Sequence, residues 1–490
     1  MKRFNKENFK TLLLTMLFIL SIALNQQLWE RISLAQIMPS VGQLETIEVK
    51  RNTNINYNIS DILSPQSFRI NFGGGLHTVL YSDTYGIWKE TLKNLKDGYF
   101  EKDVLIEEID KEKWLEANNF RSIEMRFGYN MPIDLLREMV EGKKEGIYGK
   151  VDTIDRILIS LMGDRHIYIA NHKEGKYYMI QSMKEENNFY KIVRTIEESR
   201  YDAYYALSDI YGVQNNELMP IDLDDNIHQI QVVREIDPTN DGQVEAFAGT
   251  FFGENLDFIR KIIETSGSVI YMYGYGQKAL KIDDLGVLQY IEKIDKEEAS
   301  KNIKFEEAIK IALAFISEHG SWGNIDAYLR EVKPIERDNK KGYAFLFGYR
   351  LNGFSVYCSD ENKRMDTPIK VEVLGNQVIY YKRFLKREKI AIKFLENKED
   401  KVILPASQVL DKNFEVIKND YLNNRPETLN IEEEKIAEEV LSTIQGIEIG
   451  YYDQPMNKQN YLIPIWIIKT DKITYYFNAY DGKIINYSAI

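Results

Sequence analysis

The sequence predicts an α+β fold, in which a single N-terminal transmembrane helix is followed by extracytoplasmic domains of helices packed on antiparallel sheets. The first observation behind this prediction is one long apolar segment, at residues 11–29. The second is the succession, through the rest of the chain, of helix-period segments and runs with an apolar residue at every second position. The third is the abundance of Tyr (32 residues) and Phe (22 residues), because aromatic residues favour strands.

The composition indicates a folded protein and disfavours some classes of molecule as binding partners. A length of 490 residues exceeds what one hydrophobic core holds, so roughly two to four domains are expected. A hydrophobic fraction of 44% with 28% charged residues is typical of globular proteins. The net charge of −12 disfavours nucleic acids and anionic polymers, because like charges repel. The single cysteine excludes an intramolecular disulfide.

The apolar segment Thr11–Trp29 is interpreted as a membrane span. Leu12–Leu24 is almost wholly apolar, and the whole segment just reaches the length of about 20 residues that a spanning helix needs. The preceding residues carry a local charge of about +3 by the positive-inside counting rule, from Lys2, Arg3, Lys6 and Lys10 against Glu7. We therefore expect residues 1–10 to be a cytoplasmic stub. The bulk of the chain, from about Glu30, is then expected outside a cell membrane that it spans once.

A cleaved signal peptide is the alternative interpretation of the same segment. Small residues at Ser21–Ala23 or Ser33–Ala35 fit a small-x-small cleavage site. The polar run Asn25–Gln27, which follows the first candidate site closely, argues against cleavage there. A lipoprotein anchor is excluded, since the only cysteine is Cys358. The sequence leaves open whether the segment is ever removed.

One face of the expected helix is polar. At 100° per residue, its polar members fall within about a third of the circumference, and they are Thr11, Thr15, Ser21 and Asn25. Small and hydrogen-bonding residues on one face are what helices use to associate in lipid. The other interpretation is that Thr and Ser are tolerated in a membrane and that Asn25 lies near the headgroups. The face is thus the candidate partner-binding site.

Residues 30–46 are expected to be a linker, and residues 47–240 an N-terminal α+β extracytoplasmic domain. Alternating residues predict strands at Ser67–Phe72, Ser122–Tyr129 and Arg156–Leu161 and a hairpin over His166–Ile180. Helical periodicity predicts helices at Thr84–Lys96, Pro132–Val140 and Asn188–Tyr204. The Gly73–Gly75 triplet lacks the lysine of a phosphate-binding loop and is interpreted as a bulge or loop.

The remaining chain is expected to repeat one unit, a helix followed by an antiparallel meander with a Gly-containing turn. The middle domain, residues 241–388, holds helices at Phe251–Gly267 and Phe305–Gly320, and the C-terminal domain, residues 389–490, holds one at Glu432–Ile444. Tight turns are predicted at residues 284–286, 352–353, 375–376 and 481–482. Phe384–Lys401 is interpreted as a charged helix or linker. Such units leave exposed edge strands that can accept a partner strand.

No catalytic or metal-binding motif is present in the sequence, so no enzyme, cofactor or metal site is predicted. The five histidines form no HExxH or HxH pattern. His166 and His172 belong to one predicted hairpin and are interpreted as solvated, and His319 as a helix C-cap. Cys358 has no neighbouring His or basic cluster and is interpreted as a structural thiol.

Several of these stretches together resemble the YycH family of Gram-positive bacteria. They are FKTLLLTMLFILSIALNQQLW, DILSPQSFRINFGGGLHTVLYSDTYGIW, IEMRFGYNMP, DRILISLMGDRHIYIANHKEGKYY and FFGENLDFIRKIIETSGSVIYMYG. The resemblance is one of order, size and topology over nearly the whole chain. The C-terminal segments YLIPIWII and NAYDGKII are similar to the YycI family and to PepSY-type helix-on-sheet modules.

The resemblance implies an accessory regulator. Family members are single-pass proteins that associate with YycI and with the sensor histidine kinase YycG (also called WalK), in the two-component system that controls cell-wall metabolism. Their anchor helix contacts the transmembrane helices of the kinase, which agrees with the polar face of residues 11–29. The alternative function is an anchored or secreted PepSY-like peptide-binding module, for example a peptidase inhibitor. The sequence does not indicate the sign of regulation, the stimulus, the oligomeric state or which domain contacts which partner.

Overall fold

The structure is a computed structural model. It describes residues 59–98, 105–142, 151–161, 166–181, 188–223, 227–294, 302–323, 325–360, 364–389, 401–424, 433–454 and 460–489. They belong to one of the two compact units of the chain, Val49–Ile490. The expected span 11–29, its polar face (Thr11, Thr15, Ser21, Asn25) and the linker 30–46 lie outside the described residues. Among the helices of the described part, none has the length and apolar character needed to cross a membrane.

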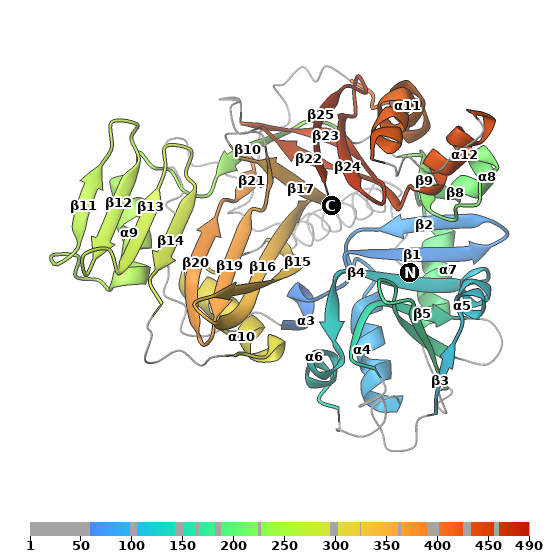
Figure 1. The fold of residues 1–490 in the computed structure, drawn as a ribbon, viewed down its shortest axis with the longest axis horizontal. Coiled ribbons are helices and arrows are strands. Elements are labelled where there is room, and N and C mark those ends of the chain that lie inside the picture. Colours follow the sequence, from blue (N-terminus) through green and yellow to red (C-terminus); the bar gives the residue numbers. More distant parts are fainter. Residues whose placement is uncertain are drawn as a thin grey trace, which may run out of the picture. The chain divides into compact units, whose positions relative to one another are not determined.

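The first half of the described chain forms a nine-stranded antiparallel sheet in the order β3-β7-β6-β5-β4-β1-β2-β8-β9 (Figure 1). Its strands are β1 (Ser67–Gly73), β2 (Leu76–Leu80), β3 (Ile106–Ile109), β4 (Ser122–Pro132), β5 (Thr153–Ser160), β6 (His166–Asn171), β7 (Lys176–Gln181), β8 (Ala203–Ala206) and β9 (Leu218–Asp222). The helices among them are α3 (Ile59–Ile62), α4 (Ile87–Gly98), α5 (Lys111–Asn118), α6 (Ile133–Met139), α7 (Phe189–Glu198) and α8 (Leu207–Tyr211).

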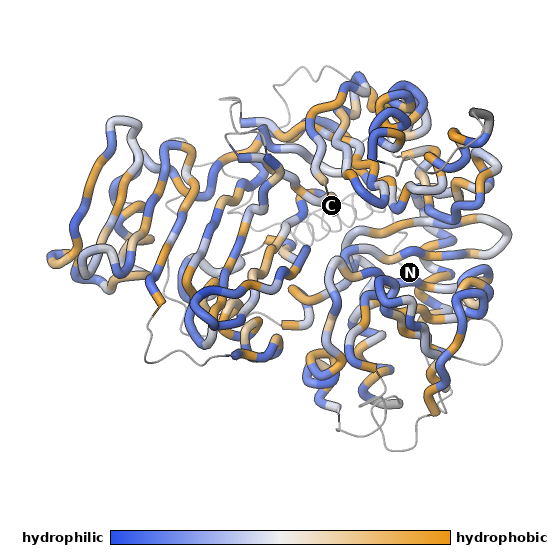
Figure 2. The backbone as a smooth tube through the Cα atoms, viewed as in Figure 1, coloured by the Kyte–Doolittle hydropathy of each residue, from blue (hydrophilic) through white to orange (hydrophobic). Residues whose placement is uncertain are grey.

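The alternation in β1 explains how this sheet is buried. Phe68, Ile70 and Phe72 are each at most 4% exposed and pack in the core with residues of α4 and α7. Arg69 and Asn71 point to the opposite face, because side chains alternate along a strand. Figure 2 shows hydrophobic and hydrophilic residues alternating along the strands.

Most elements expected in this part are confirmed. The helices expected at Thr84–Lys96 and Pro132–Val140 are α4 and α6, and the hairpin at His166–Ile180 is β6–β7. The glycine triplet is a bulged hairpin turn, since the β1–β2 register shifts between Asn71 and Gly73. The helix expected at Asn188–Tyr204 is wrong in its second half: α7 ends at Glu198 and β8 begins at Ala203, where pairing with β9 replaces the helix.

The second half forms a 16-stranded sheet whose main order is β11-β12-β13-β14-β20-β19-β16-β17-β22-β23-β10-β21. Its strands are β10 (Ile230–Arg234), β11 (Arg260–Ile263), β12 (Val269–Tyr273), β13 (Lys278–Ile282), β14 (Leu288–Glu292), β15 (Asp326–Arg337), β16 (Lys340–Leu351), β17 (Phe354–Ser359), β18 (Met365–Asp366), β19 (Ile369–Leu374), β20 (Gln377–Arg383), β21 (Lys386–Glu388), β22 (Gly446–Asp453), β23 (Tyr461–Lys469), β24 (Ile473–Asn478) and β25 (Ile484–Ala489). Its helices are α9 (Asp241–Phe252), α10 (Phe305–Glu318), α11 (Ala406–Asn423) and α12 (Glu433–Ser442).

The helix expected at Phe251–Gly267 is wrong, and its place in the chain is shifted. α9 begins ten residues earlier, where the Asn240 side chain caps it by accepting a hydrogen bond from the Gln243 N–H. It stops at Gly253, whose φ of 93° does not continue a helix. The residues that follow include the β-branched pair Ile262–Ile263 and form β11 instead.

The charged helix or linker expected at Phe384–Lys401 is wrong at its start. Residues Lys386–Glu388 form the short strand β21, which pairs with β10; residues 390–400 lie outside the described part. The 18-residue helix α11 was not predicted. The helices expected at Phe305–Gly320 and Glu432–Ile444 are confirmed as α10 and α12.

Long-range pairings merge the expected repeat units into one sheet. β14 pairs with β20, and β17 pairs in parallel with β22, which lies 95 residues further along the chain by the register Val356↔Tyr451. Two of the edges that the sequence leaves open are thereby closed. β11 is an outermost strand of this sheet (Figure 1).

Gly128 in β4 lies where the nine-stranded sheet contacts β15. A β-carbon at this position would lie 2.2 Å from the backbone oxygen of Arg330 and 1.9 Å from Nε2 of Gln66, which itself donates a hydrogen bond to that oxygen. We expect Gly128→Ala to lower the free energy of unfolding by about 1–3 kcal/mol, because the backbones must separate. Urea unfolding measures this. Gly249→Ala in α9, with open space around the added methyl group, should cause no loss.

Candidate functional site

The candidate site within the described residues is a charged cluster on the polar face of the nine-stranded sheet. We call it the Arg–Glu cluster, and it consists of Arg69, Glu124, Arg126, Arg156 and Glu217. Its side chains are between 3% and 18% exposed. Charged groups are rarely buried to this extent unless they are paired, so the cluster is a specific feature of the fold.

Strand register places the four sheet members on one face. Arg69 in β1 lies opposite Glu124 in β4, and Arg126 in β4 lies opposite Arg156 in β5. Glu124 and Arg126 are two residues apart on one strand and so share a face. Glu217 comes from outside this group, from the turn that precedes β9.

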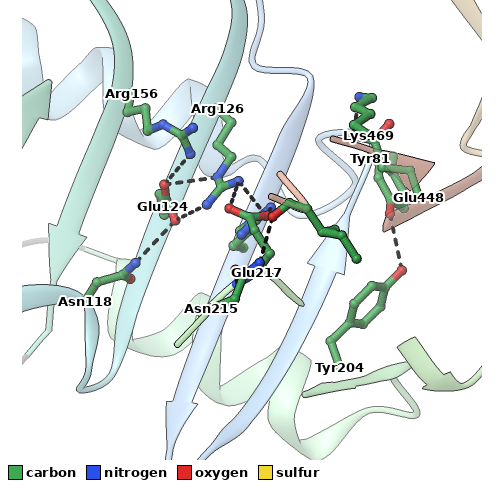
Figure 3. A network of polar contacts seen from close by, with 12 residues as sticks. Tyr81, Asn118, Glu124, Arg126, Arg156, Tyr204, Asn215, Glu217, Glu448 and Lys469 are labelled. Atoms are coloured by element: carbon green, nitrogen blue, oxygen red, sulfur yellow. Dashed lines mark hydrogen bonds and ion pairs between the residues drawn. The ribbon is translucent and has the colours of Figure 1, made fainter. Parts of the chain in front are cut away.

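The ion pairs form a chain across the sheet (Figure 3). Glu124 Oε1 accepts from Arg156 Nη1 at 2.8 Å and from Arg126 Nε at 3.0 Å. Arg126 Nη1 donates to both oxygens of Glu217, at 3.0 and 3.1 Å. Arg69 also donates to Glu217. Each carboxylate therefore joins two guanidinium groups through charge-assisted hydrogen bonds, which are stronger than those between neutral groups.

The arginines hold both carboxylates ionised. Burial by itself would raise the pKa of Glu217, but Arg126 and Arg69 outweigh it and lower that pKa to about 2. Glu124 behaves in the same way: burial opposes ionisation, and Arg126 and Arg156 bring its pKa well below the usual value. Three guanidinium groups against two carboxylates leave the cluster with one excess positive charge.

Asn215 connects the cluster to the C-terminal part of the chain. Its Oδ1 accepts the backbone N–H of Glu217 at 2.9 Å, which fixes the turn that carries this carboxylate. Its Nδ2 donates to the backbone oxygens of Leu441 and Ile444, at 2.9 and 2.8 Å, at the end of α12. A single buried side chain thus links the nine-stranded sheet to a helix that packs on the other sheet.

A second set of polar contacts lies on the same side, close to the Arg–Glu cluster (Figure 3). The hydroxyls of Tyr81 and Tyr204 are 3.4 Å apart, and Glu448 in β22 pairs with Lys469 in β23 at 2.5 Å. Burial, with Tyr204 and Glu448 nearby, raises the pKa of Tyr81 well above its usual range. These groups stay neutral or paired at physiological pH.

The arrangement is suited to mechanical coupling rather than to bond chemistry. Guanidinium groups keep their protons in proteins and the two carboxylates are fully engaged, so the cluster offers neither a nucleophile nor a base of suitable pKa. In the described part of the chain, no group of three or more His, Cys, Asp and Glu residues is arranged to hold a metal ion.

The structure does not bring the two hairpin histidines together, and the interpretation of His172 as solvated is wrong. His166 opens β6 and His172 follows its far end. The His172 ring packs against Trp114 and Tyr177, with ring centroids 6.1 and 5.2 Å away. Burial, with help from Arg156, lowers its pKa to about 4.

The other two residues singled out by the sequence are structural. Cys358 is buried, and burial raises the pKa of its thiol to about 12. His319 is at the C-cap of α10, as expected. Its ring also stacks on Phe251, with centroids 4.1 Å apart, and its Nδ1 lies 3.2 Å from Oγ1 of Thr250.

Sequence reasoning missed the Arg–Glu cluster. The signal was present as period-2 charges on the polar side of three expected strands, at Arg69, at Glu124 and Arg126, and at Arg156. This signal becomes informative only when the strand order and register are known, because charges on two strands can pair only if the strands are neighbours.

A cavity of about 250 Å³ lies between β2 and the segment before β8. The two strands pair only at His77 and Tyr204, and they diverge beyond this point. The cavity is lined by Thr78–Leu80 on one side and Arg200–Asp202 on the other, with Tyr85 and Ile196.

Residues 7–200 match the family described as YycH protein, N-terminal domain. Over these residues the chain belongs to the YycH family. A crystal structure of YycH from Bacillus subtilis superposes on this chain with a TM-score of 0.52, at 16% sequence identity, over 88% of this chain and 96% of that one. This likeness shows a shared α+β fold. The C-terminal domain of Bacillus megaterium YpeB matches 51% of the chain and 97% of its own length, at 11% identity and a TM-score of 0.23. No curated protein matches the chain.

Proposed function

We propose that this YycH-family protein is a membrane-anchored accessory regulator of a sensor histidine kinase of the YycG (WalK) type, acting with a YycI-like partner in two-component control of cell-wall metabolism. The observation that carries the proposal is the family match over residues 7–200, since membership suggests a regulator of the YycFG system. The family is one of regulatory accessory proteins and not of known enzymes.

The anchor would act by binding two conformations of the kinase with different affinity. A ligand shifts an equilibrium only by its differential binding free energy, and about 1–3 kcal/mol changes populations 5- to 150-fold. The helix of residues 11–29, with Thr11, Thr15, Ser21 and Asn25 on one face, would pack on the kinase helices inside the membrane. The external domains would contact the sensor domain of the kinase and the YycI-like partner.

The Arg–Glu cluster would make the external part respond as one body. It is paired to β9 through Glu217, and Asn215 continues the link to α12. The nine-stranded sheet lies nearer to the anchor along the chain. A displacement of this sheet would therefore be transmitted to the C-terminal sheet, because the cluster and Asn215 join the two rigidly.

The experiment that tests the proposal is a pull-down from membranes in mild detergent. The intact chain is compared with a variant whose residues 11–29 are replaced by an unrelated apolar span. We expect the intact chain to recover a sensor kinase and the replaced chain to lose it. Recovery by both would place recognition outside the membrane, and recovery by neither would contradict the proposal.

The polar face has its own prediction. Replacing Asn25 and Thr15 together by Leu should weaken association with the kinase about tenfold, because interhelical hydrogen bonds in membranes contribute about 0.6–2 kcal/mol each. Co-purification yield at fixed expression measures the change. Replacing two apolar residues of the opposite face, Leu13→Ile and Leu20→Ile, is the matched control and should leave the yield unchanged. Equal yields for the two variants would contradict the assignment of this helix face as the site that binds the kinase.

The second candidate function is an anchored or secreted peptide-binding module, and the cavity beside β2 favours it. Its volume of about 250 Å³ is just below the range of small-ligand sites, about 300–1,000 Å³. One of its walls is β2, which diverges from β8 beyond His77, and strand edges that are open in this way bind extended peptides. Recovery of a secreted peptidase in place of a kinase in the same pull-down would favour this function.

A further inference from the structure

β11 is an outermost strand of the 16-stranded sheet, and its only strand partner among the described residues is β12. Such an edge presents unpaired backbone groups on which another strand can add. Exposed apolar side chains adjoin it: Ile263 is 66% exposed, and Phe258, just before the strand, is 86% exposed.

The β11–β12 register shows which backbone groups face outward. The strand pairs run from Arg260↔Met272 to Ile263↔Val269, and the N–H of Glu264 donates to the oxygen of Ser268 at 2.8 Å on the same register. Since hydrogen-bonded pairs alternate in an antiparallel ladder, Glu264, Ile262 and Arg260 bond to β12. Lys261 and Ile263 therefore direct their N–H and C=O groups to the free edge.

The lysine of this edge strand is engaged on its own sheet. Natural edges are often shielded by a lysine that extends into solvent. Lys261 is held back over its own sheet, where its ammonium pairs with Glu245 at 3.1 Å and lies 5.8 Å from the centre of the Tyr271 ring. Glu264, on the other face, pairs with Lys281 at 3.0 Å.

We propose that the β11 edge binds the β11 edge of a second copy of this chain, antiparallel about Ile262, so that two sheets join in a symmetric dimer. In this register, Lys261 lies opposite Ile263 of the second copy, and each such pair exchanges its outward N–H and C=O groups. Ile262 lies opposite Ile262 of the second copy, and this pair is not hydrogen-bonded. Arg260 then lies opposite Glu264 of the second copy, on both sides of the axis.

The charges on β11 favour pairing about Ile262, and they favour a second copy of this chain as the strand that binds the edge. Pairing about Lys261 would also match the outward groups, but it would place Lys261 opposite Lys261 of the second copy, and like charges opposite each other destabilise a sheet. Pairing about Ile262 gives two Arg–Glu pairs instead. Pairs without hydrogen bonds bring side chains closest, which favours the ion pairs. A strand edge that is complementary to itself is what a two-fold interface requires.

The first test is disulfide trapping in the purified full chain. In a pair without hydrogen bonds the Cα atoms lie about 4.5 Å apart, within the disulfide range of about 4.4–6.8 Å. We expect Ile262→Cys to give a covalent dimer under mild oxidation, because Cys358 is buried. Tyr487→Cys, at a 67% exposed position on β25, is the matched control and should remain largely monomeric. Equal cross-linking of the two variants would overturn the proposal.

The second test is charge exchange, measured by sedimentation of the full chain. Arg260→Glu or Glu264→Arg alone places like charges opposite each other and should raise the dimer Kd about tenfold; the exchange Arg260→Glu with Glu264→Arg should restore it. Ile263→Pro should abolish dimerisation, because it removes an N–H that faces the free edge. It removes no N–H that bonds to β12. The contact is smaller than a standard interface, so the unmodified Kd is expected on the order of 10–100 μM.

Three further outcomes would overturn the proposal. A chain that stays monomeric up to about 200 μM, above the Kd expected for a contact of this size, does not pair through β11. A dimer that is insensitive to Ile263→Pro and to charge reversal uses another surface. Capture of a different protein by β11 in a monomeric chain would assign the edge to that protein.

Discussion

Replacing Glu235 with alanine is expected to lower the free energy of unfolding by about 3–5 kcal/mol, because it removes the carboxylate that neutralises the buried guanidinium of Arg383. Glu235 follows β10, and Arg383 ends β20; their side chains are 2% and 0% exposed. The pair is bidentate, with Nε–Oε2 and Nη2–Oε1 distances of 2.7 Å each. Urea unfolding followed by tryptophan fluorescence measures the loss.

Two further variants separate the ion pair from the packing around it. Replacing both partners, Glu235→Leu with Arg383→Met, should cost much less than Glu235→Ala alone, because no buried charge remains. Glu331→Ala removes an exposed partner of Lys333 and should change stability by less than about 1 kcal/mol. A loss for Glu235→Ala that is no larger than for Glu331→Ala would contradict the prediction.

Glu217→Gln is expected to cost about 2–3 kcal/mol at pH 7. The carboxylate pairs with both Arg69 and Arg126. The cost is below the full penalty of a buried pair because the Glu217 side chain is 18% exposed and water reaches it. Gln retains the size and one acceptor oxygen of Glu, so the variant tests the charge. The free energy of unfolding in urea, against the unmodified chain, measures it.

The same residue predicts a pH dependence. The pKa of Glu217 is lowered from 4.5 to about 2 in the folded protein. A lowered pKa stabilises the fold fully above the unfolded value and less as the pH falls through the folded value. The unmodified chain should therefore lose stability between about pH 4.5 and pH 2, and the Glu217→Gln variant should lose less in this window. Parallel curves for the two proteins would show that Glu217 does not carry the charge coupling.

Local patterns predicted most elements of the fold. The strand at Ser67–Phe72 follows from period-2 apolar residues, and α10 from Ala308, Ala312 and Phe315 at helical spacing. The predicted turns at residues 352–353, 375–376 and 481–482 contain Gly353, Gly375 and Gly482, each with positive φ. Prediction failed where a neighbour far along the chain supplied the structure, as β10 does for β21.

The candidate site was less accessible to sequence reasoning than the fold. Each member of the Arg–Glu cluster is an ordinary polar position on a strand, and Glu217 precedes β9 in a turn. Among 63 basic and 75 acidic residues, no rule of spacing selects these five. An ion pair matters for stability only where folding excludes water from it, because exposed pairs contribute little to the free energy of unfolding.

By itself the sequence determined the α+β class, the faces of the strands, the turns and the resemblance that led to the YycH family. These depend on side chains within a few residues of one another, which set backbone propensity and burial. The tertiary structure alone decided which strands pair, as β17 does with β22, and which charges meet, as Glu217 does with Arg69 across 148 residues. Such contacts form only when the core of the whole unit brings distant segments together, since their loop-closure entropy must first be repaid by burial.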